Sequence, residues 1–149
     1  MGISDEELLE RYPWGAFDHD SKAQWKGYLD HKLLVNRCQE CGHWINPPRP
    51  MCPKCWSERV EATEVSGLGH VQWFTLLHQG APSGAPLPFP VVTVELEEQP
   101  NLRIDSTIVD CDPADIACDM KVELTWVDQN GTPVPAFRPA GRKDRLRDV

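Results

Sequence analysis

The chain has 149 residues, a formal net charge of −8 at pH 7 and 40% hydrophobic residues. This length suits one compact domain, or a small metal knuckle plus one domain, and is too short for a thiolase, a synthase or a Rossmann dehydrogenase. The acidic balance disfavours general binding to nucleic acids or anionic membrane surfaces.

The beginning of the chain carries no targeting signal that we recognise. The first ten residues, MGISDEELLE, are acidic and lack the apolar stretch of a secretory signal. No apolar run in the sequence approaches the length of a membrane span. We therefore expect a cytoplasmic protein that makes no use of a membrane.

A short helix is expected over residues 3–12. Ser4 and Glu7 have the spacing of a capping box, in which each side chain accepts a hydrogen bond from the other residue's backbone N–H. Pro13 then ends the helix, because the residue before a proline disfavours helical backbone. A helix this short needs packing partners to be stable.

A second helix is expected over residues 20–31, with Asp18 or Asp20 as its N-cap. Trp25, Tyr28 and Leu29 fall on one face of it, at the i, i+3 and i+4 spacing. Such an aromatic face either packs against the rest of the chain or binds a partner. The sequence leaves both interpretations open.

Two C-x-x-C pairs follow, with ten residues between them. Two residues between cysteines allow one tight turn to aim both sulfurs at a point, and two such turns close the tetrahedron of a structural zinc site. Paired C-x-x-C motifs without a secretory signal favour a metal over two disulfides, and iron in a rubredoxin-like site is the nearer alternative to zinc. We predict one Zn²⁺ per chain, bound by Cys38, Cys41, Cys52 and Cys55.

The remainder of the sequence has the pattern of a β protein. Residues 33–35 and 58–65 are expected as strands of the ribbon. A Gly/Pro-rich loop over residues 79–90 and an acidic turn or short helix over 110–120 interrupt the later strands, and Asn130-Gly131 is a hairpin signal. Five strands with a break after the third suit an OB-fold barrel. These strands are expected over residues 70–78, 91–96, 102–109, 121–127 and 134–138.

The predicted fold is therefore mainly β, with N-terminal helices, a rubredoxin-like zinc ribbon and a five-stranded OB-fold barrel. The boundaries that we expect are 1–32 for the helical segment, 33–63 for the zinc ribbon, 64–139 for the OB-fold domain and 140–149 for a charged tail.

The sequence resembles the DUF35 family of small proteins with a zinc ribbon and an OB-fold. The resemblance covers roughly residues 18–139 and is most specific over LLVNRCQECGHWINPPRPMCPKC, residues 33–55. It continues in VSGLG at 65–69, VVTVEL at 91–96 and FRP at 137–139. The bulky Trp56 departs from the small residue that we expect after the second cysteine pair.

The resemblance implies a companion subunit of a thiolase-superfamily enzyme that acts on acyl-CoA. Family members accompany thiolases, acyltransferases and the lipid-transfer-protein-like aldolases of steroid breakdown. The expected partners are therefore a thiolase-superfamily subunit in a hetero-oligomer and acyl-CoA or CoA as a shared ligand at the interface. We expect no catalytic residue in this chain, and we expect Cys111 and Cys118 to take no part in bond making.

Coenzyme A requires cations for its phosphates and an apolar channel for its pantetheine arm. Loop residues 85–89 could form a wall of that channel. Each single candidate could equally be a solvated cation or a structural loop residue. The candidate contacts are Arg49, Phe89, Arg103 and Arg138, with Arg142 and Lys143 as further cations.

Two other functions remain as alternatives. An OB-fold nucleic-acid binder with a zinc knuckle needs a basic groove with stacking aromatics, yet residues 91–131 carry ten acidic and two basic side chains. A rubredoxin-like electron carrier would bind iron and would not need an OB barrel. Metal analysis distinguishes that alternative from a zinc protein.

Overall fold

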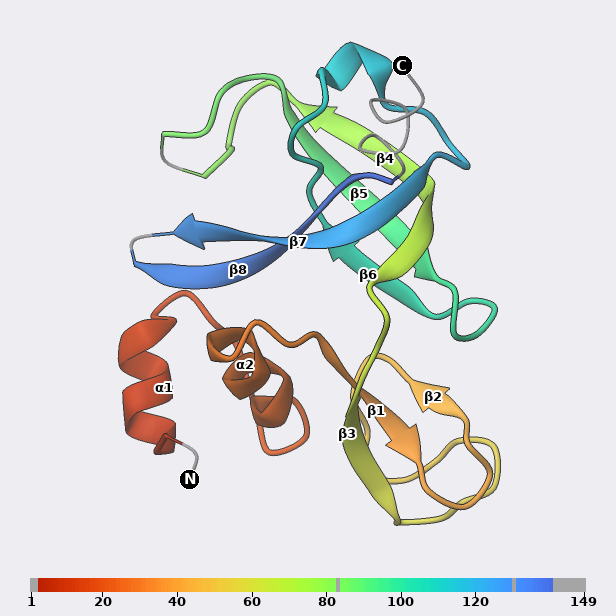
Figure 1. Cartoon of the computed structure of the whole chain (residues 1–149). Coiled ribbons are helices and arrows are strands. Elements are labelled where there is room, and N and C mark those ends of the chain that lie inside the picture. Colours follow the sequence, from red (N-terminus) through yellow and green to blue (C-terminus); the bar gives the residue numbers. More distant parts are fainter. Residues whose placement is uncertain (1–2, 83, 130, 141–149) are drawn as a thin grey trace. The chain divides into compact units, whose positions relative to one another are not determined.

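The computed structural model describes residues 3–82, 84–129 and 131–140. The chain forms two compact units, shown with their elements in Figure 1. The first comprises Met1–Val65 and Trp126–Pro135, and the second comprises Ser66–Thr125 and Ala136–Val149. Three residues of the sequence-based predictions, Asn130, Arg142 and Lys143, lie outside the described residues, as does most of the predicted charged tail.

The first unit begins with helix α1 (Asp5–Arg11), which starts as its sequence predicts. The Ser4 hydroxyl accepts a hydrogen bond from the Glu7 N–H, and the Glu7 carboxylate accepts one from the Ser4 N–H at 2.9 Å. The capping box is therefore confirmed. Leu8 is fully buried and anchors the helix on the unit.

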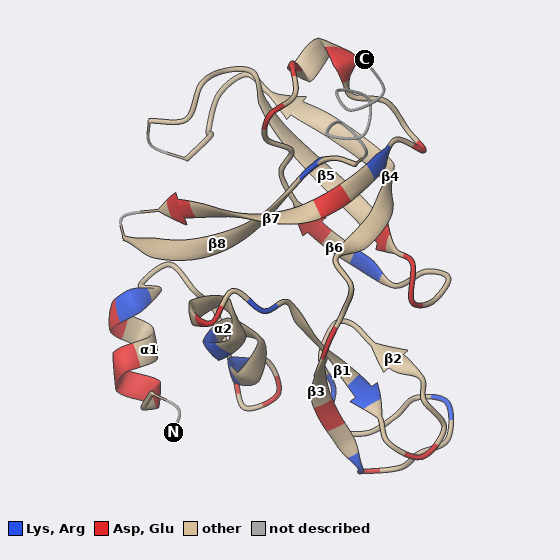
Figure 2. Cartoon of the chain, in the orientation of Figure 1, with Lys and Arg blue, Asp and Glu red and all other residues tan. Residues whose placement is uncertain are grey.

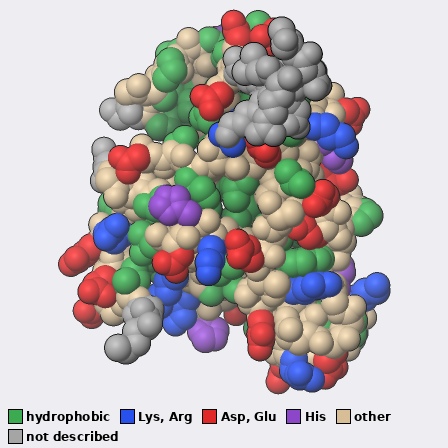
Figure 3. All heavy atoms as spheres, viewed as in Figure 1, with side chains coloured by type: hydrophobic (Ala, Val, Ile, Leu, Met, Phe, Trp, Pro, Cys, Tyr) green, Lys and Arg blue, Asp and Glu red, His purple; other side chains and the backbone are tan. Residues whose placement is uncertain are grey.

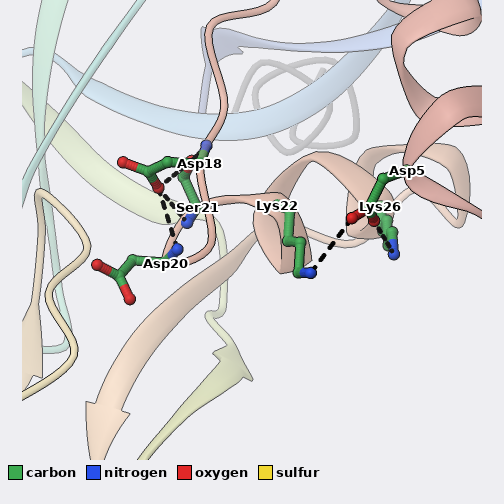
Figure 4. A network of polar contacts seen from close by, with 6 residues as sticks. All are labelled: Asp5, Asp18, Asp20, Ser21, Lys22 and Lys26. Carbon is green, nitrogen blue, oxygen red and sulfur yellow. Dashed lines mark hydrogen bonds and ion pairs between the residues drawn. The ribbon is translucent and has the colours of Figure 1, made fainter.

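Helix α2 (Lys22–Leu29) starts later than the sequence indicates, because its N-cap is Ser21 and neither Asp18 nor Asp20. The prediction of an aspartate N-cap is therefore wrong. The Asp18 carboxylate instead accepts the backbone N–H groups of Asp20 and Ser21, both at 3.0 Å, and stabilises the turn before the helix. Figure 4 shows this turn together with an ion-pair network that joins α1 to α2.

In that network, the Asp5 carboxylate of α1 faces two lysines of α2. The Lys26 Nζ lies 3.0 Å from it and the Lys22 Nζ lies 3.4 Å away. These ion pairs lower the pKa of the Asp5 carboxyl, the hydrogen bond from Lys26 being the largest cause. All three side chains are partly or largely exposed, so the network positions the two helices and contributes little stability.

An aromatic cluster forms the core of the helical part. Tyr12 is fully buried, and its ring lies 5.3 Å from that of Trp25 and 6.2 Å from that of Tyr28. Tyr28 in turn contacts Trp126, at 5.8 Å between ring centroids. The aromatic face of α2 therefore packs inside the first unit, which is the simpler of the two interpretations that the sequence allowed.

The zinc-ribbon part of the first unit is a small antiparallel sheet with the strand order β2-β1-β3. Strand β1 covers Leu34–Cys38, β2 covers Trp44–Ile45 and β3 covers Val60–Glu64. Cys38 is paired with Val60 across the sheet, which fixes the position of the first cysteine knuckle.

The second unit is built on a five-stranded antiparallel sheet with the order β6-β5-β4-β7-β8. Val71 of β4 and Val92 and Val94 of β5 are completely buried and form part of the core. The hairpin strands β7 and β8 also contribute residues to the first unit. The bounds are β4 (Leu68–Leu77), β5 (Phe89–Leu96), β6 (Arg103–Ser106), β7 (Lys121–Gln129) and β8 (Thr132–Pro139).

The two edges of this sheet meet where the chain leaves β6. Ile108 pairs in parallel with Phe137 of β8, and the Val109 N–H donates to the Phe137 carbonyl at 2.8 Å. A short 3₁₀ helix, η1 (Pro113–Asp115), fills the break between β6 and β7. The sheet is thereby curled as the predicted OB-fold requires. In the described parts of the chain, no helix has the length and apolar character needed to cross a membrane.

Candidate metal centre

The four predicted ligand cysteines lie together at the tip of the ribbon sheet. Their Sγ atoms are all within 4.8 Å of one another. The Cys38 and Cys55 sulfurs are 3.5 Å apart, and those of Cys41 and Cys52 are 3.6 Å apart. A regular tetrahedron of sulfurs around zinc, with Zn–S bonds of about 2.3 Å, has sulfur separations of about 3.8 Å. The cluster therefore fits a tetrahedral metal ion.

Each C-x-x-C pair is held by the same kind of turn. The Gly42 N–H donates to the Cys38 carbonyl at 3.0 Å, and the Trp56 N–H donates to the Cys52 carbonyl at 2.9 Å. Both residues that close these turns have left-handed backbone, with φ of +77° at Gly42 and +67° at Trp56. A bulky residue rarely adopts that conformation, so the second knuckle is built at a local conformational cost.

Backbone N–H groups point at the sulfurs from both turns. The N–H of Cys41 lies 3.5 Å from the Cys38 sulfur, and the N–H of Lys54 lies 3.4 Å from the Cys52 sulfur. Such donors stabilise negative charge on sulfur and orient the ligand. These hydrogen bonds therefore favour the thiolate form of the cysteines, which is the form that binds a metal.

The pKa values of the thiols follow from these contacts. Hydrogen bonding, chiefly from the Cys41 N–H, lowers the pKa of the Cys38 thiol to about 6. Burial raises the pKa of Cys52, but the N–H groups of Cys55 and Lys54 outweigh it and lower the pKa overall. The Ser57 N–H acts to lower the pKa of Cys55, whereas burial and the neighbouring thiols raise it to about 12. Because a metal ion binds the thiolate form, metal binding to such a cluster releases protons.

A cation, Arg37, is held beside the first knuckle. The Arg37 Nε donates to the Gly42 carbonyl at 3.1 Å, and its guanidinium lies 4.6 Å from the centroid of the Trp44 ring. These contacts hold Arg37 against the first knuckle. A zinc ion bound by four thiolates has no open position, so its contribution here would be structural: it would join the two knuckles.

The residues near the cysteines that are not ligands have other roles. The His43 carbonyl accepts the Cys38 N–H at 2.9 Å, and its ring is not part of the metal-binding cluster, which contains only cysteines among the described residues. Cys111 and Cys118 belong to the second unit and are also outside the cluster. The sequence-based choice of ligands is therefore the one that the geometry favours.

The predicted coenzyme A contacts are distributed over both units. Arg49 belongs to the first unit, and the other three belong to the second. Arg103 lies on β6 and Arg138 on β8, the two outermost strands in the order of the sheet. Arg138 donates to Glu123 at 2.8 Å, and Arg103 donates to Asn101 at 3.1 Å. The two arginines therefore have different partners, and their roles stay predictions.

Arg49 lines two hollows in the first unit, of about 260 and 580 Å³. Trp56 lines the larger one and is 75% exposed. Phe89 lines a groove of about 570 Å³ in the second unit, whose other wall is formed by residues 107–113. The sequence reasoning missed that wall. The signal available was the apolar pair Ile108 and Val109 followed directly by acidic residues.

Two family descriptions match the sequence in adjacent segments. Residues 25–61 match the ChsH2 rubredoxin-like zinc ribbon domain, and residues 62–127 match the ChsH2 C-terminal OB-fold domain. A DUF35 domain-containing scaffold protein from Pyrococcus furiosus is 34% identical over 103 residues, which cover 67% of this chain and 73% of that protein.

A second relative is the benzoylsuccinyl-CoA thiolase subunit BbsA of Geobacter metallireducens. It is 34% identical over 89 residues, covering 60% of this chain and 58% of that subunit. The chain spans only about two fifths of the length of other curated relatives that it matches.

Among solved structures, the chain is similar to one from the Ltp2-ChsH2(DUF35) aldolase. The superposition has a TM-score of 0.78 at 29% identity, and it covers 85% of this chain and 98% of that one. The fold of this chain therefore matches that of a chain of this aldolase over nearly the whole of that chain.

Proposed function

Because the chain belongs to the DUF35 family, with a ChsH2-type zinc ribbon and OB-fold domain, we propose that it is a companion subunit of an acyl-CoA enzyme of the thiolase or aldolase type. The observation that carries this proposal is the likeness to a chain of the Ltp2-ChsH2(DUF35) aldolase over 98% of that chain's length. The match to a thiolase subunit points to the same class of assembly.

In such a complex the partner subunit supplies the groups that react, and this chain supplies a brace. The cysteine cluster supports that division of labour, because four thiolates around one metal leave no free thiol in the cluster and no open coordination position. The zinc ion would hold together a ribbon whose sheet has only three short strands.

Two exposed tryptophans support an interface. Trp56 in the zinc ribbon is 75% exposed and Trp73 on β4 is 53% exposed. Tryptophan is enriched among the residues that dominate binding energy at protein interfaces, and exposed indoles on a small isolated domain reduce its solubility. Both side chains are therefore suited to contact with a partner subunit.

The shared ligand of this complex is acyl-CoA. Among the predicted contacts Arg49 has the strongest support, because a cation and an exposed aromatic ring, that of Trp56, line one hollow of about 580 Å³. A guanidinium suits a phosphate group and an indole suits the face of adenine. Arg103 and Arg138 remain candidates that the partner would have to complete, whereas Phe89 lines a groove with acidic residues and is a weaker candidate.

The experiment is capture of the tagged full-length chain from its own organism, followed by mass spectrometry of what co-purifies. We expect a thiolase-superfamily subunit, and we expect the two proteins, when co-expressed, to elute as one complex in size-exclusion chromatography at physiological salt. A chain that stays monodisperse on its own and captures no thiolase-superfamily protein contradicts the proposal.

A further inference from the structure

The second unit contains a groove between the loop before β5 and the segment that follows β6. We call it the proline groove and define its walls as residues 86–90 and 107–113. Its volume is about 570 Å³, within the range of sites that accept a drug-sized ligand or a few side chains. Figure 3 shows hydrophobic side chains gathered over this loop, at the upper left of the view.

The two walls of the proline groove are tied together. The Thr107 hydroxyl donates to the Pro90 carbonyl at 2.7 Å, which joins one wall directly to the other. The Val109 N–H donates to the Phe137 carbonyl at 2.8 Å, so the second wall is also bonded to β8. Pro86 and Pro88 restrict the backbone of the first wall. The groove is therefore formed before anything binds, which lowers the entropic cost of binding.

The lining is apolar and includes an exposed leucine. Eight of the twelve residues that line it are Pro, Leu, Ile, Val or Phe. Leu87 is 56% exposed, whereas Ile108 on the opposite wall is only 4% exposed. An apolar groove with an exposed leucine is suited to bury apolar side chains of another molecule.

The described lining of the proline groove is acidic where it is charged. Among the described residues it includes Asp110 and Asp112 and no Lys or Arg. The wider stretch 104–120 carries five aspartates and no basic residue. Figure 2 shows acidic positions in the segment between β6 and β7 that contains η1. Such a rim repels the phosphate groups of coenzyme A and attracts an occupant with basic groups.

We propose that the proline groove docks a polypeptide segment of the partner subunit that carries apolar side chains flanked by Lys or Arg. This inference rests on the proposed function, because the partner is the same acyl-CoA enzyme subunit. It adds the chemistry by which that partner is recognised. The apolar side chains supply the burial, and the basic flank selects the orientation at the acidic rim.

The test uses the complex of the full-length chain with its co-purifying thiolase-superfamily subunit. Leu87→Ser should weaken binding of that subunit roughly tenfold, since it removes most of one leucine's burial. Leu9→Ser is the matched control, because Leu9 on α1 is similarly exposed, at 52%, and should change the affinity less than twofold. Leu87→Met should restore most of the affinity. Thermal melting and zinc content verify that each variant folds.

The acidic rim has its own test. The variant Asp112→Asn should slow association and flatten its dependence on salt, because steering by unlike charges is screened. Asparagine keeps the side-chain oxygen at position 112, where Asp112 accepts the Ala114 N–H at the start of η1. The variant therefore changes charge with little change in local structure.

Three other results would overturn the inference in different ways. If the wild-type chain binds no thiolase-superfamily subunit, the proposed function fails and this inference fails with it. If the complex forms and Leu87→Ser binds as tightly as Leu9→Ser, the groove is not the docking site and the proposed function stands. If Leu87→Ser assembles normally but raises KM for acyl-CoA, the occupant is the ligand and not a polypeptide.

Discussion

The hydroxyl of Tyr12 donates a 2.7 Å hydrogen bond to the carbonyl oxygen of Pro133, 121 residues further along the chain. A second bond connects the same two segments, from the Thr132 hydroxyl to the Arg11 carbonyl at 3.2 Å. Tyr12 is fully buried. The end of α1 is therefore fastened to the tip of the β7–β8 hairpin inside the first unit.

Tyr12→Phe should destabilise the first unit by roughly 1–2 kcal/mol. The substitution keeps the ring and its aromatic contacts, but it leaves the Pro133 carbonyl without the hydroxyl donor. The free energy of unfolding in urea measures the change. Leu9→Ala, at a site that is 52% exposed, should stay within about 0.5 kcal/mol of wild type and serves as the surface control. Equal unfolding midpoints for the two variants would show that the Tyr12 bond contributes nothing.

The same phenol should make the protein less stable in alkali. Burial raises the pKa of Tyr12 to about 12, from an ordinary value of 10.0. The fold favours the neutral phenol, so its stabilising contribution is complete below pH 10 and is lost as the pH rises from 10 to 12. Tyr12→Phe should therefore flatten the decline of unfolding free energy over this window. If Tyr12→Phe loses stability over this window as steeply as wild type does, the decline comes from other groups. Tyr28 is one such group, because burial also raises its pKa.

Substitutions of the cysteines should have two distinct effects on the zinc content of the chain. Cys38→Ser removes one of four ligands, so the chain should lose its zinc and the ribbon should unfold. Cys111→Ser and Cys118→Ser leave the cluster intact and should retain one zinc per chain. Native mass spectrometry measures the metal content, and X-ray absorption gives the number of sulfur ligands. Stoichiometric iron, or fewer than four sulfurs around zinc, would contradict the assignment.

Much of this architecture could be predicted because its signals are local. The C-x-x-C spacing alone places Cys38 near Cys41 and Cys52 near Cys55, and the Ser4–Glu7 capping box needs only one helical turn. Alternating apolar residues likewise predict the strands of the OB-fold sheet. In each case the interacting residues lie within a few positions of one another, or follow a repeating period.

Other features depend on contacts between distant segments. Nothing near Tyr12 in the sequence indicates that Pro133 accepts its hydrogen bond, or that Trp126 packs against Tyr28. The start of α2 was misplaced because Asp18 stabilises the preceding turn through two backbone N–H groups, as an N-cap residue also would. Trp56 has the same left-handed backbone as Gly42 and closes the equivalent turn of the second knuckle. A bulky residue gives no sequence signal for that backbone conformation, so only the structure shows it.

A close approach between two strands predicts the effect of Gly69→Ala. A Cβ at Gly69 would collide with the Glu95 carbonyl oxygen on β5, so the backbone of the sheet would have to move. The expected loss is about 2 kcal/mol or more. At Gly80 a Cβ meets nothing within 4 Å, and Gly80→Ala should cost only about 1 kcal/mol, for the positive φ of +78°. Urea midpoints compare the two, and a Gly69→Ala loss no larger than the Gly80→Ala loss would contradict the packing argument.

The most direct test of the companion-subunit account is the acyl-CoA turnover of the co-purified partner, measured with wild-type chain, with Cys38→Ser, and with the double variant Cys111→Ser and Cys118→Ser. The account predicts that the double variant supports turnover close to wild type with an unchanged pH profile. Cys38→Ser should lose turnover through lost zinc and lost assembly. If the double variant is zinc-loaded and fully assembled but inactive, this chain supplies a reacting thiol and the account is wrong.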